Sequence, residues 1–186
     1  MSDARSTYEV EVKVPATLDR VRERVRSIGA SDEGRVEQVD TYYDAPHRTF
    51  SKTDEALRIR TERRSGDERV ELTYKGPLVE RASKTRAEVE TEVDDAVAAA
   101  EILERLGFEP AATVRKDRHR FAFDGVTITL DEVDGVGTYV EVERTATADS
   151  IDETRAELFA TLDRLGLDPD EQVRTSYLGL MLEGES

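Results

Sequence analysis

The chain has 186 residues, of which 37% are hydrophobic, and this is enough for one compact domain with a buried core. It has no cysteine and two histidines, which excludes disulfides, thiolate catalysis and zinc–sulfur sites and leaves any metal to oxygen ligands. The formal net charge is −15, which argues against nonspecific binding to nucleic acid or to an anionic membrane.

No apolar run approaches the roughly 20 residues of a membrane-spanning helix. The first residues also lack the apolar core of a signal peptide. We therefore expect a cytoplasmic protein with no membrane partner.

Lysine is rare in this chain. Five of the 27 basic residues are lysines, and the rest are arginines. An acidic, lysine-poor surface is typical of proteins from a very salty cytoplasm, so we expect salt adaptation. Four of the five lysines nevertheless lie on or beside predicted strands, which suggests specific roles for them: Lys13, Lys75, Lys84 and Lys116.

The first predicted strand is EVEVK, residues 9–13, in a segment where valines alternate with charged residues. Side chains of a strand point alternately to opposite faces, so two glutamates and one lysine share a face. Such carboxylates can bind a hard divalent cation, and the lysine can bind an anion beside it. Taken alone, the segment is better explained as an ordinary amphipathic strand with its charged face in water. The pattern gains weight because it recurs.

The remaining elements follow from alternation, helical spacing and turn residues. We expect further strands at residues 35–43, 56–61, 70–75, 84–93, 113–123, 126–133 and 139–143. We expect helices at 18–28 and 95–106, a long helix that starts with a capping box at 150–153 and ends at Gly166, and a short final helix at 176–182. Asp124-Gly125 is the strongest hairpin signal, and Gly76-Pro77 is expected to end a strand.

Charged residues of both signs recur at alternate positions of these strands, and therefore on one face of each strand. An open sheet with one wet face could display them all. The apolar stripes of the helices, however, need an apolar sheet face, and if helices cover the outside of a closed barrel, the charged faces line its interior. Burying so many charges costs several kcal/mol per ion, so such a lumen should be wet and hold a polyanion with its metals. We predict an α+β fold: one domain, residues 1–186, with a closed eight-stranded antiparallel β-barrel, a tunnel, and helices packed outside.

The ordered motifs resemble the CYTH, or triphosphate tunnel metalloenzyme, superfamily, and within it the archaeal type of the class IV adenylyl cyclase (CyaB-like) branch. The resemblance runs from residue 8 to about residue 182. It rests on EVEVK (9–13), DTYYD (40–44), EALRIR (55–60), LTYKGP (72–77), RAEVE (86–90), VRKDRHRF (114–121), LDEVDGVGTYVEVE (130–143) and SYLGL (176–180).

This resemblance implies roles for the charged residues. The metal, Mg²⁺ or Mn²⁺, would be held by carboxylates from Glu9, Glu11, Glu88, Glu90, Asp131, Glu141 and Glu143. The triphosphate would be gripped by Lys13, Arg58, Arg60, Lys75, Arg86, Lys116 and Arg118. Among these cations, the resemblance assigns catalytic roles to Lys13, Lys75 and Arg118.

The implied reaction is the conversion of ATP to cyclic AMP and pyrophosphate. One alternative is a triphosphatase that hydrolyses inorganic, thiamine or nucleoside triphosphate. Another is a non-catalytic module that binds polyphosphate or nucleotide, and a third is a purely structural, salt-adapted barrel. The expected partner is a nucleoside or inorganic triphosphate, with no nucleic acid or membrane, and a homodimer is a candidate assembly.

Overall fold

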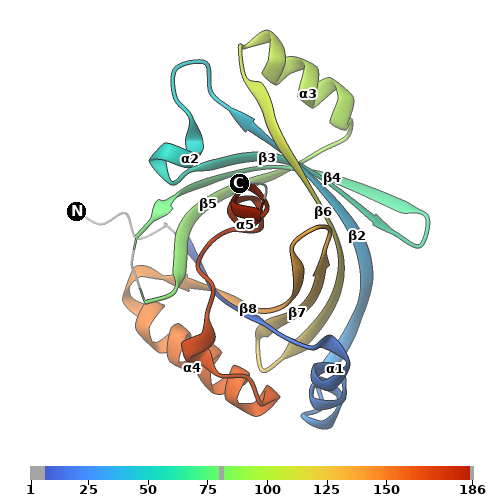
Figure 1. Cartoon of the computed structure of the whole chain (residues 1–186), viewed down its shortest axis with the longest axis vertical. Coiled ribbons are helices and arrows are strands. Elements are labelled where there is room, and N and C mark those ends of the chain that lie inside the picture. Colours follow the sequence, from blue (N-terminus) through green and yellow to red (C-terminus); the bar gives the residue numbers. More distant parts are fainter. Residues whose placement is uncertain (1–6, 80–81, 185–186) are drawn as a thin grey trace.

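Eight antiparallel strands close into a barrel in the computed structural model, which describes residues 7–79 and 82–184 (Figure 1). The order around the barrel is β1-β5-β4-β3-β2-β6-β7-β8. The strands are β1 Thr7–Pro15, β2 Ser31–Asp44, β3 Ala56–Arg64, β4 Asp67–Leu78, β5 Lys84–Val93, β6 Glu109–Phe123, β7 Val126–Val133 and β8 Gly137–Thr147. The predicted fold class is confirmed.

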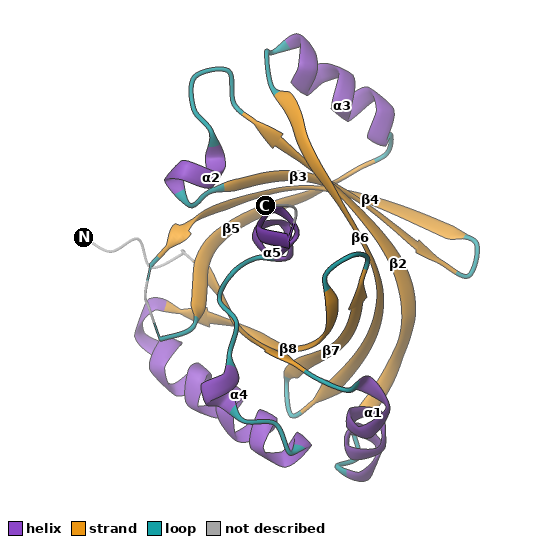
Figure 2. Ribbon diagram, in the orientation of Figure 1, coloured by secondary structure: helices purple, strands orange, loops and turns teal. Residues whose placement is uncertain are grey.

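Helices lie outside the ring of strands, apart from the last one, which lies within its outline when the barrel is viewed end-on (Figure 2). They are α1 Leu18–Ser27, α2 Phe50–Thr53, α3 Ala96–Arg105, α4 Ile151–Leu165 and α5 Tyr177–Gly184. Two 3₁₀ turns, η1 Ala148–Ser150 and η2 Pro169–Glu171, flank α4. Within the described residues, no helix is long and apolar enough to cross a membrane.

The first strand closes the barrel because it pairs with β5 on one side and β8 on the other. In these pairings Glu11 lies opposite Lys84 and also opposite Glu143, while Lys13 lies opposite Glu141. Residues directly opposite each other in a ladder share a face. The register therefore directs the charged side chains of three strands to the same side of the barrel wall.

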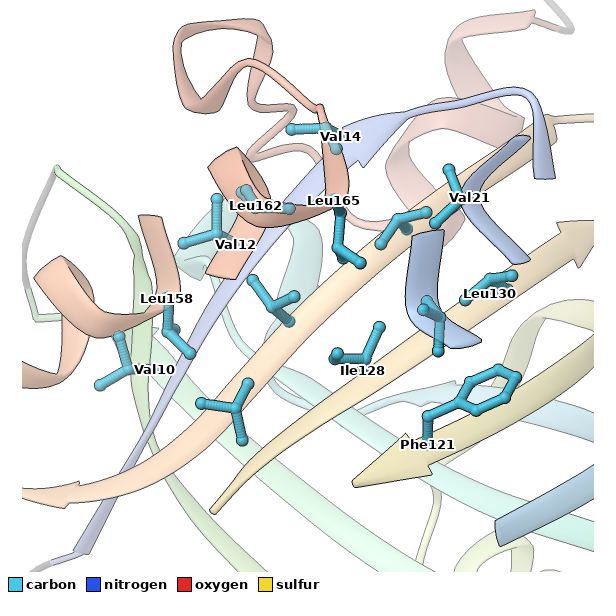
Figure 3. Packing of buried hydrophobic residues seen from close by; sticks show 14 of the residues in the cluster. Val10, Val12, Val14, Val21, Phe121, Ile128, Leu130, Leu158, Leu162 and Leu165 are labelled. Carbon is cyan, nitrogen blue, oxygen red and sulfur yellow. The ribbon is translucent and has the colours of Figure 1, made fainter. Parts of the chain in front are cut away.

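The apolar side chains on the other face of the same strands form the core outside the barrel. Val10, Val12 and Val14 are at most 1% exposed and pack against leucines of α4, including Leu158 and Leu162 (Figure 3). A second cluster places Ile59 and Leu72 with residues of α3, and Ile128 joins the first cluster. As predicted, the helices cover apolar strand faces, and this leaves the charged parity to the interior.

Several predicted boundaries differ from the structure. The β2 and β6 strands begin earlier than expected, and β4 continues through Gly76-Pro77 to Leu78. A register shift between Lys75 and Leu78 is the bulge that accommodates the proline. Asp124 and Gly125 both have positive φ, 49° and 78°, and form the expected two-residue hairpin turn.

The predicted capping box at residues 150–153 is wrong. The capping box joins Thr147 and Ser150 around the 3₁₀ turn η1, and the Thr147 amide donates to the Ser150 hydroxyl at 3.0 Å. The Ser150 side chain makes no capping hydrogen bond to α4. The sequence pattern assigned the Ser150 hydroxyl to the cap of the long helix, but this hydroxyl hydrogen-bonds within the 3₁₀ turn instead.

Candidate functional site

The barrel encloses a cavity of about 600 Å³ that is lined by residues from all eight strands. This volume lies in the usual range for small-molecule sites. Most predicted site residues line it directly: Glu9, Glu11, Arg58, Arg60, Lys75, Arg86, Glu90, Lys116, Arg118, Glu141 and Glu143. The other three contact these residues or the C-terminal segment that lines the cavity: Lys13, Glu88 and Asp131. The structure therefore brings the predicted set to one lumen.

Three carboxylates of the first and last strands form a candidate metal centre. Glu9 and Glu11 of β1 and Glu143 of β8 each offer an oxygen, and these oxygens lie within 4.8 Å of one another. Burial, reinforced by the charge of Glu9, raises the pKa of Glu143 to about 8. Without a further cation beside it, Glu143 therefore holds its proton at neutral pH, and a bound metal would favour its ionised form. An oxygen-only donor set of three carboxyl groups fits a hard cation such as Mg²⁺ or Mn²⁺.

Two buried ion pairs fix arginines in the wall. Arg60 donates to both oxygens of Asp40, from Nε at 2.6 Å and from Nη2 at 2.7 Å. Arg118 donates to both oxygens of Asp131, at 2.7 and 2.5 Å, and also to Glu141. Bidentate pairs of this kind hold a guanidinium in one orientation. Asp131 is therefore placed as the partner of Arg118.

Two lysines are tied to the acidic cluster. Lys75 Nζ donates to Glu88 and to Glu9, the latter at 3.2 Å. Lys84 Nζ donates to both oxygens of Glu11, at 2.9 and 3.2 Å. These contacts place cations directly beside the candidate metal centre, where a metal-bound phosphate would need them.

Three other buried cations are more loosely paired. Arg58 Nη1 lies 3.6 Å and Lys116 Nζ lies 3.8 Å from Asp40, whose closer partner is Arg60. Lys13 Nζ donates to the backbone carbonyl of Thr175 at 2.5 Å. Burial, with Arg118 and Arg60 nearby, lowers the pKa of Lys116 to about 7. Burial, with Lys84 nearby, lowers that of Lys13 to about 8.

These lowered pKa values mark positive charge that the free protein does not fully balance. Burial raises the pKa of Asp40, but Arg60, Arg58 and Lys116 outweigh it and hold that pKa well below its usual range. One carboxylate thus serves three cations. An incoming polyanion would supply negative charge at Lys13 and Lys116.

Two predicted residues occupy the edges of the site. Glu90 is exposed, and its carboxylate accepts a hydrogen bond from Thr73 at 3.0 Å. Arg86 donates to the carbonyls of Asp54 and Gly76 and forms an ion pair with the Asp54 carboxylate at 2.8 Å. Arg86 therefore braces the turn that follows α2.

Sequence reasoning did not assign three residues of the lumen: Asp40, Lys84 and Tyr177. Asp40 lies within the DTYYD motif, and its position opposite Arg60 is visible only once β2 and β3 are paired. Lys84 could have been found, because it shares the parity of Arg86 and is one of the rare lysines. Tyr177 follows no strand alternation, since it reaches the lumen from α5.

The fold and site define a class of protein: a closed antiparallel barrel with a charged lumen that can hold a metal and a polyanion. The CYTH domain model matches residues 7–177, and the chain belongs to the CYTH domain family.

The chain is similar to curated relatives in sequence and to solved structures in fold. The chain is 33% identical over 174 residues to the "Putative adenylate cyclase" of Methanocaldococcus jannaschii, covering 92% of this chain and 97% of the relative. It is 26% identical over 143 residues to the adenylate cyclase CyaB of Aeromonas hydrophila, covering 76% and 70%. The PH1819 protein of Pyrococcus horikoshii has 44% identity and a TM-score of 0.88, with 94% and 98% covered. A Hippeastrum adenylyl cyclase homologue described as having a dominant triphosphatase activity shares the fold, with 16% identity, a TM-score of 0.69 and 96% of both chains covered.

Proposed function

We propose that this protein is a metal-dependent adenylyl cyclase that converts ATP to cyclic AMP and pyrophosphate in the barrel lumen. The family assignment and the adenylate cyclase names of its relatives support this reaction. One observation carries the proposal: Glu9, Glu11 and Glu143 converge in the same cavity as loosely paired Lys116, and Lys13 contacts the Thr175 carbonyl of the segment that lines this cavity. A metal site beside unbalanced positive charge is the arrangement that a metal–triphosphate complex requires.

Glu9, Glu11 and Glu143 would hold Mg²⁺ or Mn²⁺. When bound, the metal would neutralise phosphate charge and help to orient the reacting groups. We propose that Asp131 and Glu141 act by holding Arg118, because their oxygens already accept its hydrogen bonds. Direct metal ligation by Asp131, Glu141, Glu88 and Glu90 remains a prediction.

The cations divide into two groups by their present partners. Arg58, Lys116 and Lys13 lack a close carboxylate contact among the described residues, so we propose that they meet the phosphate oxygens first. Arg60, Lys75, Arg86 and Arg118 are already held by partners and would present fixed donors. Fixed donors cost little reorganisation when charge develops on the phosphates.

In the proposed reaction the ribose 3′-oxygen forms a bond to the α-phosphorus, and the bond from that phosphorus to the bridging oxygen breaks. The 3′-hydroxyl proton passes to solvent water, and pyrophosphate leaves with the bond electrons. Lys13, Lys75 and Arg118 would stabilise the developing charge. Removing one such preorganised contact costs on the order of a hundredfold or more in rate.

Apolar side chains also line part of the cavity. They come from Leu57 of β3, Ala112 of β6, and Leu178 and Leu182 of α5. Inorganic triphosphate offers nothing for such residues to contact, so this lining supports a substrate with an organic group.

Triphosphate hydrolysis is the second candidate, because the Hippeastrum protein with the same fold is described as a dominant triphosphatase. The two reactions give different products. Incubation with ATP and Mg²⁺ or Mn²⁺, followed by separation of products, should yield cyclic AMP with pyrophosphate. ADP with orthophosphate would favour the second candidate, and binding without turnover would favour a non-catalytic module. If the protein neither binds ATP nor converts it, both proposed reactions are wrong.

A further inference from the structure

The C-terminal segment reaches into the lumen and touches two of the loosely paired cations. The Val173 amide donates to the Lys13 carbonyl at 2.7 Å, and the Lys13 ammonium donates to the Thr175 carbonyl at 2.5 Å. Tyr177, the first residue of α5, is 6% exposed and lines the cavity. In the end-on view, α5 lies inside the outline of the barrel (Figure 1).

The ring of Tyr177 serves both lysines at once. Lys13 Nζ lies 4.2 Å and Lys116 Nζ lies 5.1 Å from its centroid, and both distances are within the range of a cation–π contact. Tyr139 packs against the ring, with centroids 5.4 Å apart. Two ammonium groups from β1 and β6, which are separated by two strands in the barrel, therefore lie over one aromatic ring.

The hydroxyl of Tyr177 has a separate partner. It donates to Asp131 Oδ2 at 2.9 Å, and Asp131 is the carboxylate that holds Arg118. One side chain therefore contacts two lysines through its ring and reaches an arginine through a carboxylate. A buried tyrosine hydroxyl needs a hydrogen-bond partner. Among the hydrogen bonds of the described residues, Asp131 is the one partner of the Tyr177 hydroxyl.

We propose that Tyr177 is a positioning residue of the triphosphate site, whose ring holds the ammonium groups of Lys13 and Lys116 ready for phosphate oxygens. Without the ring, each lysine would turn towards its nearest carboxylates: Glu141 and Glu11 for Lys13, and Asp40 for Lys116. The inference deepens the proposed function, because it assigns the step that prepares this site for a polyanion.

Two substitutions separate the ring from the hydroxyl. Tyr177→Phe keeps the ring, and Tyr177→Leu removes it. The matched control is Leu180→Ala, on the same helix, because Leu180 packs in the apolar cluster around α5 and does not line the cavity. We would measure the binding of inorganic triphosphate with Mg²⁺ by calorimetry. Tyr177→Leu should weaken it about tenfold, as expected when desolvated cation–π contacts are lost, while Tyr177→Phe should stay within about twofold.

Turnover gives a second distinction, since loss of the hydroxyl loosens Asp131 and Arg118. Tyr177→Phe should lower kcat more than it raises KM, and Tyr177→Leu should change both. Equal losses in Tyr177→Leu and Leu180→Ala would reduce Tyr177 to a packing residue and overturn the proposal. Unchanged affinity in a folded Tyr177→Leu variant would also overturn it.

A measurement on the unmodified protein tests the ring geometry without a substrate. With five lysines in the chain, the Hε signals of Lys13 and Lys116 can be assigned by NMR. The ring should shift both signals upfield relative to Lys52, and Tyr177→Phe should keep the shift. Absence of the shift in the unmodified protein would refute the positioning role. A protein that shows the shift but binds no triphosphate would refute the proposed function and leave the ring geometry intact.

Discussion

Asp40→Asn tests whether the lumen is built for a polyanion. Asp40 is 1% exposed and is the shared partner of Arg60, Arg58 and Lys116, at 2.6, 3.6 and 3.8 Å. Removing one member of a buried ion pair costs about 3–5 kcal/mol. Lys116 can lose its proton, since its pKa is already lowered to about 7, and this places the expected loss near 3 kcal/mol.

The assay is denaturant unfolding with and without inorganic triphosphate. A bound polyanion replaces the missing carboxylate, so triphosphate should stabilise Asp40→Asn more than the unmodified protein. The matched control is Asp19→Asn, because Asp19 is 89% exposed and pairs with Arg22 on the surface at 2.7 Å. That change should cost less than about 1 kcal/mol.

The pH dependence of this difference has a defined sign. The folded protein holds the pKa of Asp40 far below that of the unfolded chain, so its contribution is complete above about pH 4 and is lost as the pH falls further. Both proteins should gain stability above pH 7 as folded Lys116 loses its proton, because the unfolded chain then binds more protons. In Asp40→Asn this gain should begin at a lower pH, because Asp40 raises the pKa of Lys116. Equal stability of the two proteins at pH 7, or no extra stabilisation by triphosphate, would refute the reasoning.

Three further predictions concern metal, lysine placement and the core. Glu143→Gln should cut turnover with Mg²⁺ or Mn²⁺ by about a hundredfold or more without loss of stability, and full activity in excess chelator would contradict the metal site. Lys75→Arg should lose most activity at saturating triphosphate, because Lys75 is fixed between Glu88 and Glu9, while exposed Lys52→Arg should be silent in the same assay. Leu162→Ala, at a position 0% exposed outside the barrel, should cost about 2–5 kcal/mol in denaturant unfolding and leave triphosphate affinity unchanged.

Much of the lumen could be predicted from the sequence, because strand alternation alone assigns each side chain to one face of the barrel wall. The parity of Glu9, Glu11 and Lys13 placed them together, and Val10 and Val12 on the opposite parity placed the helices outside. A period of two residues is enough for this distinction.

Partner choice was not predictable, since it depends on register and on long-range contacts. Asp131 lies on the lumen-facing side of its strand, as a metal ligand would. The pairing of β6 with β7, however, sets it opposite Arg118. Tyr177 and Asp131 are 46 positions apart in the chain. The sequence of α5 does not indicate that the Tyr177 side chain points into the lumen. The sequence also did not predict the 3₁₀ turn η1, which places the capping box at Thr147 and Ser150 instead of at residues 150–153.

The most direct test of the account is a crystal structure with Mn²⁺ and a non-hydrolysable ATP analogue, read by anomalous scattering. We predict a manganese peak among Glu9, Glu11 and Glu143, with phosphate oxygens on Lys13, Arg58 and Lys116. Manganese bound elsewhere, or an analogue seated outside the barrel with the lumen empty, would contradict the proposed site.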